Sequence, residues 1–73
     1  MFVSVKLFIE NKDPNSEKEL EFLYDVHINI AQVESILPRG EDKEHSILRL
    51  VHGDKIIVTD TESVNRLLAA SNS

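Results

Sequence analysis

The chain has 73 residues, with 13 acidic and eight basic side chains, a net charge of −5 and no cysteine. This length allows one domain with one small core, because a chain of about 60 residues buries only about 60% of its unfolded surface. The lack of cysteine excludes disulfides, thiolate metal sites and cysteine nucleophiles, and the acidic charge argues against direct binding to nucleic acid or to an anionic membrane.

We predict an α+β fold: a small, curled antiparallel β-meander of about four to five strands, closed by one short C-terminal helix. Residues 1–73 are expected to form a single domain. Its expected parts are a β-hairpin with a polar loop over residues 1–30, strands and a Gly53-Asp54 hairpin over 31–59, a helix over 60–70 and a tail over 71–73.

The N-terminal part of the chain alternates as paired strands do. Over residues 3–9 the odd positions are all apolar, which is the period of a strand with one apolar face. A polar turn containing Asp13-Pro14-Asn15 follows. Residues 20–30 alternate more sharply, so we expect them to pair with the first strand and to place Phe22 and Tyr24 in the core.

The segment after residue 28 predicts a turn and a short strand. Asn29 can cap a short turn through Ala31 and Gln32. Residues 33–37 then indicate a short strand that Pro38 stops.

The second half of the chain predicts a hairpin after a charged loop. We expect the loop over residues 39–45 and two strands over 46–51 and 55–59. The strands flank His52-Gly53-Asp54, and a glycine at the first central position of a two-residue loop is typical of a type II′ turn.

The C-terminal segment carries the signals of a helix start. Thr59 to Glu62 matches a capping box, with Asp60 as a competing N-cap. Apolar residues follow at the spacing of one helical stripe, namely Val64, Leu67 and Leu68. A helix of about two to three turns is too short to be stable alone, so we expect it to plug an open end of the curled sheet.

The residues give no support for catalysis or for a metal centre. The three histidines, at positions 27, 45 and 52, lack the spacing of zinc ligands. The serines lack a glycine-flanked elbow, and the two glycines cannot form a phosphate-binding loop. We therefore expect no enzyme, no catalytic residue, no metal site and no cofactor.

An acidic cluster surrounds the first turn, with five acids and two bases over residues 10–21. It is either a solvated tip or a knob for a basic peptide, in which case the exposed edge of the first strand offers β-augmentation. Phe2 and Phe8 lie opposite the apolar face of that strand and are either core or partner anchors. The candidate partner-binding residues are Phe2, Phe8, Glu10, Asp13, Glu17, Glu19 and Glu21.

Part of the chain resembles a family of short flagellar and swarming-motility proteins. The resemblance is carried by an Asn-led turn and strand, a glycine-turn hairpin and a helix start, namely Asn29-Ile30-Ala31-Gln32-Val33-Glu34-Ser35-Ile36, residues 47–50, His52-Gly53-Asp54-Lys55, Ile57-Val58 and Glu62-Ser63-Val64. The first 28 residues do not follow this family. The resemblance implies a structural motility accessory protein that acts through self-association.

The whole chain is similar to small RNA-polymerase-binding transcription regulators of lytic Xanthomonas phages. The similarity lies in length, acidity, absence of cysteine and a strand-rich layout with a short terminal helix; no single motif carries it. It implies a non-enzymatic protein that binds the N-terminal segment of the largest polymerase subunit and the flap of its neighbour. Such a protein inhibits initiation by displacing the sigma factor and also acts in antitermination.

These observations leave three hypotheses for the function. The polymerase-binding regulator is preferred, the motility accessory protein is the alternative, and an acidic nucleic-acid mimic is the third. No apolar run approaches the roughly 18 residues of a membrane span, and Met1 leads straight into a strand pattern without a basic leader. We therefore expect a cytoplasmic protein, in the host cytoplasm if a phage encodes it, with no membrane contact and no direct contact with nucleic acid. The oligomeric state stays open.

Overall fold

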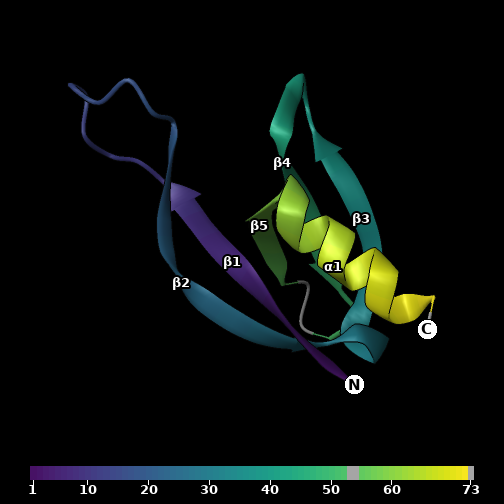
Figure 1. Cartoon of the computed structure of the whole chain (residues 1–73). Helices are drawn as coiled ribbons and strands as arrows, with labels where there is room; N and C mark the ends of the chain where they lie inside the picture. The colour runs from purple at the N-terminus through teal and green to yellow at the C-terminus, as the bar shows by residue number, and fades with distance from the viewer. Residues whose placement is uncertain (53–54, 73) are drawn as a thin grey trace.

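The computed structural model describes residues 1–52 and 55–72. The elements in chain order are β1 (Phe2–Glu10), β2 (Leu20–Asn29), the 3-10 turn η1 (Ile30–Gln32), β3 (Val33–Arg39), β4 (Asp42–Leu50), β5 (Ile56–Asp60) and α1 (Thr61–Ser71). The strands form one antiparallel sheet in the order β2-β1-β5-β4-β3 (Figure 1). The predicted α+β class, an antiparallel sheet with one C-terminal helix, is confirmed.

The strand order joins the first strand of the chain to the last. Each strand pairs with the next one along the chain except β2 and β3, which η1 connects at the two outer edges of the sheet. β1 instead pairs with β5 through Phe8 and Val58. The sheet therefore remains open between β2 and β3, and β1 lies inside it. The expected β-augmentation at the edge of the first strand is wrong, because both sides of β1 have neighbours.

A β-bulge at Leu23 divides the β1–β2 hairpin into two parts. Tyr24 pairs with Leu7 and Phe22 pairs with Phe8, so Leu23 has no partner in β1. Because paired residues share a face of the sheet, the two aromatic side chains lie on opposite faces. Phe22 is 50% exposed and Tyr24 is 55% exposed. Their expected place in the core is wrong, because one extra residue shifts the strand period.

The core lies between α1 and one face of the sheet. Its buried side chains are Val5, Ile28, Leu48, Val64 and Leu67. The helix supplies two of them, and each such burial stabilises the fold by about 2 kcal/mol. Leu68 is 47% exposed, so the predicted helical stripe is narrower than the sequence indicated.

Asp60 caps the N-terminus of α1. Its Oδ1 atom accepts a hydrogen bond of 2.9 Å from the Ser63 backbone N–H. Burial raises the pKa of Asp60, but hydrogen bonding by Ser63 and the nearby positive charges of Lys6 and Arg66 outweigh burial and lower that pKa overall. Of the two competing caps that the sequence predicted, Asp60 is therefore the one used. The Thr59 side chain is fully buried, and its hydroxyl has no hydrogen-bond partner within the described part of the chain.

Where β1 does not pair with β5, side chains of α1 bind the backbone groups of β1 that point away from β2. The Lys6 backbone N–H donates to Ser63 Oγ at 3.0 Å, and Arg66 Nε donates to the Ser4 carbonyl at 3.2 Å. Arg66 Nη2 donates to the same Ser63 hydroxyl at 3.0 Å. The fully buried Ser63 side chain thus has its partners, and the helix replaces a neighbouring strand along this part of β1.

β3 is longer than the sequence indicated. It continues through Pro38, which pairs with Ser46, so the expected stop at this proline is wrong. An outer strand tolerates proline because one side of its backbone needs no partner. The expected loop over residues 39–45 is also wrong, since β4 begins at Asp42 after a turn in which Gly40 has a φ of 56°, a left-handed conformation that glycine adopts without strain.

The cap of η1 agrees with the sequence pattern. Asn29 Oδ1 accepts a hydrogen bond of 3.1 Å from the Ala31 backbone N–H. The predicted turn at Gly53-Asp54 lies outside the described residues.

Candidate protein-interaction site

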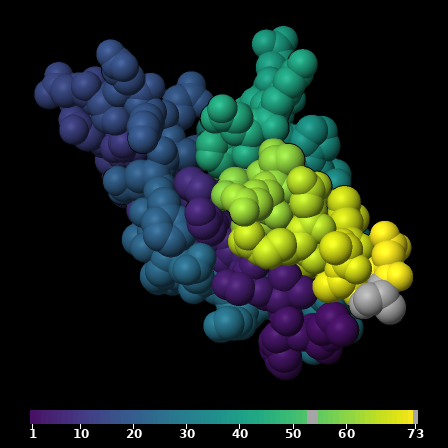
Figure 2. All heavy atoms as spheres, in the orientation of Figure 1, coloured from purple at the N-terminus to yellow at the C-terminus, as the bar shows by residue number. Residues whose placement is uncertain are grey.

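A groove separates the two hairpins of the sheet. The outer half of the β1–β2 hairpin and the β3–β4 hairpin diverge at the top of Figure 1, and Figure 2 shows the hollow between their tips. The space has a volume of about 550 Å³. We call it the acidic groove; its lining residues are Phe8, Glu17, Lys18, Glu19, Leu20, Glu21, Phe22, Arg39, Asp42, Glu44 and His45.

Three aromatic rings form the floor of the acidic groove. The Phe8 ring lies 4.8 Å from the His45 ring and 6.0 Å from the Phe22 ring, both measured between centroids and both edge-to-face. Such aromatic contacts contribute about 0.5 to 1.5 kcal/mol beyond the area that they bury. Lys6 Nζ lies 5.8 Å from the Phe22 centroid, so one face of this ring already interacts with a cation.

An apolar row crosses the sheet and supports this floor. Each member pairs with the next one on the neighbouring strand, in the order Phe22, Phe8, Val58, Ile47 and Leu37. Paired residues share a face, and Leu48, next to Ile47 in β4, points to the face that packs on α1. The row therefore lies on the face opposite the helix. Its two ends, Phe22 and Leu37, are 50% and 42% exposed.

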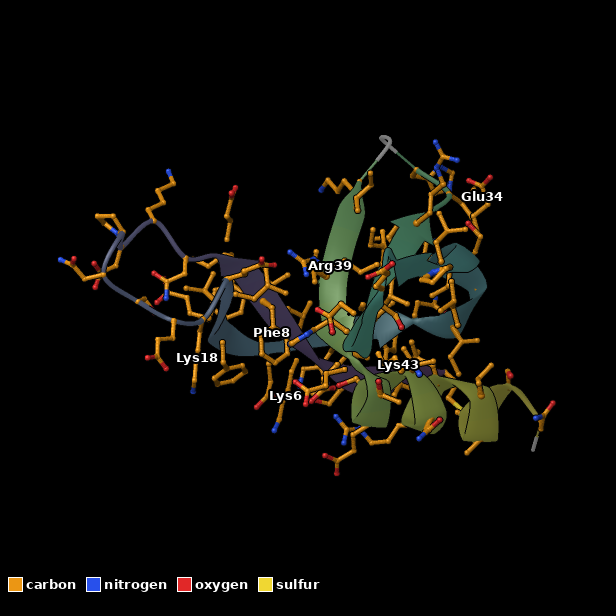
Figure 3. All side chains as sticks on the ribbon, turned by 90° about the horizontal axis from the view of Figure 1, so that it is seen from above. Lys6, Phe8, Lys18, Glu34, Arg39 and Lys43 are labelled. Atoms are coloured by element: carbon orange, nitrogen blue, oxygen red, sulfur yellow. The ribbon has the colours of Figure 1, made fainter. Side chains whose placement is uncertain are left out.

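Arg39 joins the two hairpins across one side of the groove. Its Nη1 atom lies 2.9 Å from Asp42 Oδ2 and its Nη2 atom lies 3.4 Å from Glu19 Oε2. Figure 3 shows Arg39 and Phe8, which reach this space from different strands. The Glu19 side chain is 82% exposed, and exposed ion pairs of this kind contribute about 0 to 1 kcal/mol. A competing cation can therefore displace Arg39 from Glu19 at little cost.

Asp42 is the most strongly bonded carboxylate of the groove. A hydrogen bond from the Glu44 backbone N–H is the main cause that lowers its pKa; burial opposes this, and the His45 and Arg39 contacts lower the pKa further. The His45 Nδ1 atom lies 2.9 Å from Asp42 Oδ2. Since a carboxylate oxygen only accepts, His45 Nδ1 carries the hydrogen. Asp42 is thus ionised and has its partners within the fold.

Other carboxylates of the groove have no such partner. Among the described residues, Glu17, Glu21 and Glu44 form no salt bridge. All three are exposed and line the groove. Unpaired carboxylates beside exposed aromatic rings attract a cationic group without first breaking an internal ion pair.

The structure brings together some of the predicted site residues. Phe8 lines the groove together with three predicted carboxylates, Glu17, Glu19 and Glu21. The others, Glu10, Asp13 and Phe2, lie outside its lining.

The three predicted residues outside the groove have different surroundings. Asp13 Oδ1 accepts from the Asn15 backbone N–H at 2.9 Å and shapes the loop. Glu10 is exposed at the end of β1. Phe2 is 68% exposed and lines a separate groove at the other end of β1. A partner-binding role for all seven residues stays a prediction.

Sequence reasoning missed five residues that line the groove with Phe8 and Glu19, namely Phe22, Arg39, Asp42, Glu44 and His45. Phe22 was expected in the core because the bulge at Leu23 leaves no mark on the sequence pattern. The other four belong to the segment that was expected to be a loop. Residues 39–45 contain no apolar side chain, so no alternation indicated that β4 begins at Asp42.

Comparison of the chain with protein-family models, with curated proteins and with solved structures finds no match. No helix within residues 1–52 and 55–72 is long and apolar enough to cross a membrane. In the same residues, no three side chains of the metal-binding types are placed to hold a metal ion together. The fold and the site define a small α+β domain with an acidic groove over an aromatic floor.

Proposed function

We propose that this chain is a non-enzymatic protein-binding regulator that holds a basic segment of its partner in the acidic groove. The observation that carries the proposal is the placement of three unpaired carboxylates, Glu17, Glu21 and Glu44, around the rings of Phe8 and Phe22. Lysine and arginine combine a charged head with an apolar stem. Such a side chain matches both the carboxylates and the aromatic floor.

The proposed partner is bacterial RNA polymerase, at the N-terminal segment of its largest subunit. The support for this partner is the similarity in length, acidity and layout to the phage regulators, together with a groove suited to a basic segment. In this proposal the protein inhibits transcription initiation by displacing the sigma factor, acts in antitermination and works in the host cytoplasm. It makes no direct contact with nucleic acid, as its charge of −5 favours.

The association rate with purified bacterial RNA polymerase tests the proposal. Glu17→Gln, Glu21→Gln and Glu44→Gln together remove three charges from the groove and keep the shape of each side chain. We expect association at low salt to slow by about tenfold or more, because electrostatic steering acts mainly on association. Added salt should slow the wild type and leave this variant almost unchanged.

A second triple variant serves as the matched control. Glu34→Gln, Glu41→Gln and Glu62→Gln change the net charge equally at exposed positions outside the groove lining. We expect this control to slow association by less than about threefold. Equal slowing in both variants would show that only net charge matters and that the groove is not the site. If the wild type does not bind polymerase at low salt, this partner is wrong and the motility accessory role becomes the leading hypothesis.

A further inference from the structure

β2 offers unpaired backbone groups along its outer edge. In an antiparallel pair, the backbone N–H and C=O groups of alternate residues point toward the neighbouring strand and those between them point away. Lys6 and Ser4 pair with Asp25 and His27. The Lys6 N–H and the Ser4 carbonyl point away from β2, since side chains of α1 bind them. The backbone groups of Asp25 and His27 therefore point away from β1, toward the outside of the sheet.

A bulge at Leu23 interrupts the first half of β2, but the outer edge of residues 24–29 has little of the usual protection of an edge strand. Residues 21–25 are exposed without interruption, although a strand that covers a core normally alternates. β2 contains no proline, lysine or arginine, the residues that commonly block an edge. The opposite edge, β3, contains Pro38 and has two register shifts. Of the two outer strands in the described part of the chain, β2 thus presents the edge that is more open to another strand.

A second groove lies beside this edge. It has a volume of about 520 Å³, and we call it the edge groove. Its apolar lining comes from Phe2, Val26, Ile28, Leu50 and Ile57. It meets the later half of β2, and the rest of its lining comes mainly from β1, η1, β4 and β5. A strand placed along β2 would bury apolar side chains there.

The charge along β2 changes from one end to the other. Glu21 lies in its first half and lines the acidic groove, and Asp25 is exposed at its middle. Near the second half, the edge groove is lined by His52 and Lys55 and by no described carboxylate. An occupant of this edge therefore needs basic residues beside the first half of β2 and apolar residues beside the second half.

We propose that the outer edge of β2 binds an extended segment of the partner as a sixth, antiparallel strand, hydrogen-bonded to Asp25 and His27. An antiparallel segment runs against β2, so it begins with apolar residues and ends with basic ones. The inference rests on the proposed protein-binding role and specifies how the partner is held. The acidic first half of β2 favours a basic segment over a second copy of this chain, whose own β2 contains no lysine or arginine.

Backbone hydrogen exchange on the whole protein tests the inference. The probe is the peptide acetyl-Val-Thr-Val-Thr-Val-Lys-Val-Lys-Val-Lys-amide at saturating concentration and low salt. We expect the amides of Asp25 and His27 to exchange at least about tenfold more slowly with the peptide bound. The amides of Tyr24 and Val26, which point toward β1, should change little.

Two N-methylated versions of the peptide provide the matched controls. In each version, methyl groups replace the backbone N–H hydrogens along one edge of the peptide strand. The two versions carry these methyl groups on opposite edges. Charge and side chains stay the same. A strand paired with β2 uses one edge only, so we expect one version to bind as the parent peptide does and the other to lose binding.

Each contrary result separates this inference from the proposed function. Peptide binding that shifts the ring signals of Phe8 and His45 without slowing exchange at Asp25 and His27 would overturn strand addition and leave the acidic groove as the site. Equal binding of both methylated peptides, or no binding of the parent peptide, would also overturn it. Slowing that appears without peptide as the protein concentration rises would identify a second copy as the occupant. Slowed exchange in a protein that does not bind polymerase would keep strand addition and reject that partner.

Discussion

Replacing Ser63 with alanine should destabilise the fold through β1, although the residue lies in α1. Its hydroxyl is fully buried and accepts hydrogen bonds from the Lys6 backbone N–H and from Arg66 Nη2. Alanine leaves the Lys6 N–H without its acceptor, which costs about 1 to 3 kcal/mol. Alanine also favours the helix by about 0.5 kcal/mol relative to serine. The expected net loss is therefore about 0.5 to 2.5 kcal/mol.

Urea unfolding and thermal melting, both followed by circular dichroism, measure this loss. For a domain of this size it corresponds to a fall of about 2 to 20 °C in Tm. Ser71→Ala is the matched control, because Ser71 is exposed in the last turn of the same helix and its hydroxyl bonds only within the helix, to the Leu68 carbonyl. We expect this control to change the free energy of unfolding by about 0.5 kcal/mol or less.

The Lys6 amide provides a local measurement of the same contact. Its hydrogen exchange should become faster in Ser63→Ala and stay unchanged in Ser71→Ala. A Ser63→Ala protein that melts as the wild type does, with unaltered exchange at Lys6, would refute the role of α1 as a cover for the edge of β1.

Three further predictions concern the helix cap and the acidic groove. Asp60→Ala should lower the free energy of unfolding by about 1 kcal/mol, whereas Thr59→Val should not lower it, because that buried hydroxyl has no partner among the described residues; chemical unfolding compares the two, and equal losses would contradict the single cap. The fold lowers the pKa of Asp60 below its ordinary value of 3.8, so the stability that its carboxylate contributes is complete above about pH 4 and is lost as the pH falls through the lowered pKa. Unfolding at a series of pH values should show that the difference in the free energy of unfolding between wild type and Asp60→Asn shrinks in acid. A difference that stays constant with pH would contradict this prediction. Arg39→Gln should strengthen binding of a lysine-rich peptide at low salt, because it frees Glu19 and Asp42 from their internal cation; titration calorimetry measures this, and weaker binding would mean that Arg39 holds the groove in its binding shape.

The sequence predicted the elements of this fold better than their arrangement. Period-two alternation located the first two strands, and the short polar signals located the Asn29 turn and the Asp60 helix start, because each depends on neighbours within a few residues. The pairing of Phe8 with Val58 depends on residues far apart in the chain. No local pattern shows such a contact, so the open seam and the free β2 edge could not be predicted.

The candidate site was predicted only in part, for a related reason. The acidic cluster around the first turn was visible as composition, and three of its glutamates do line the acidic groove. The other wall comes from Arg39 at the end of β3 and from three residues of β4, and all four lie within the 39–45 segment that the sequence suggested was a loop. The bulge at Leu23 moves Phe22 onto the same face as Phe8, and a pattern with strict alternation cannot show that shift.

The cover that α1 places over β1 has a consequence for the order of folding. The two hydrogen bonds that complete β1 join residues 57 and 62 positions apart, Lys6 to Ser63 and Ser4 to Arg66. Loops of this length close late, and chains dominated by such distant contacts fold slowly. During synthesis one side of β1 in the N-terminal hairpin therefore stays unpaired until α1 has been made. A product truncated before Ser63 would expose the unpaired backbone groups of β1, and unpaired strand edges of this kind promote aggregation.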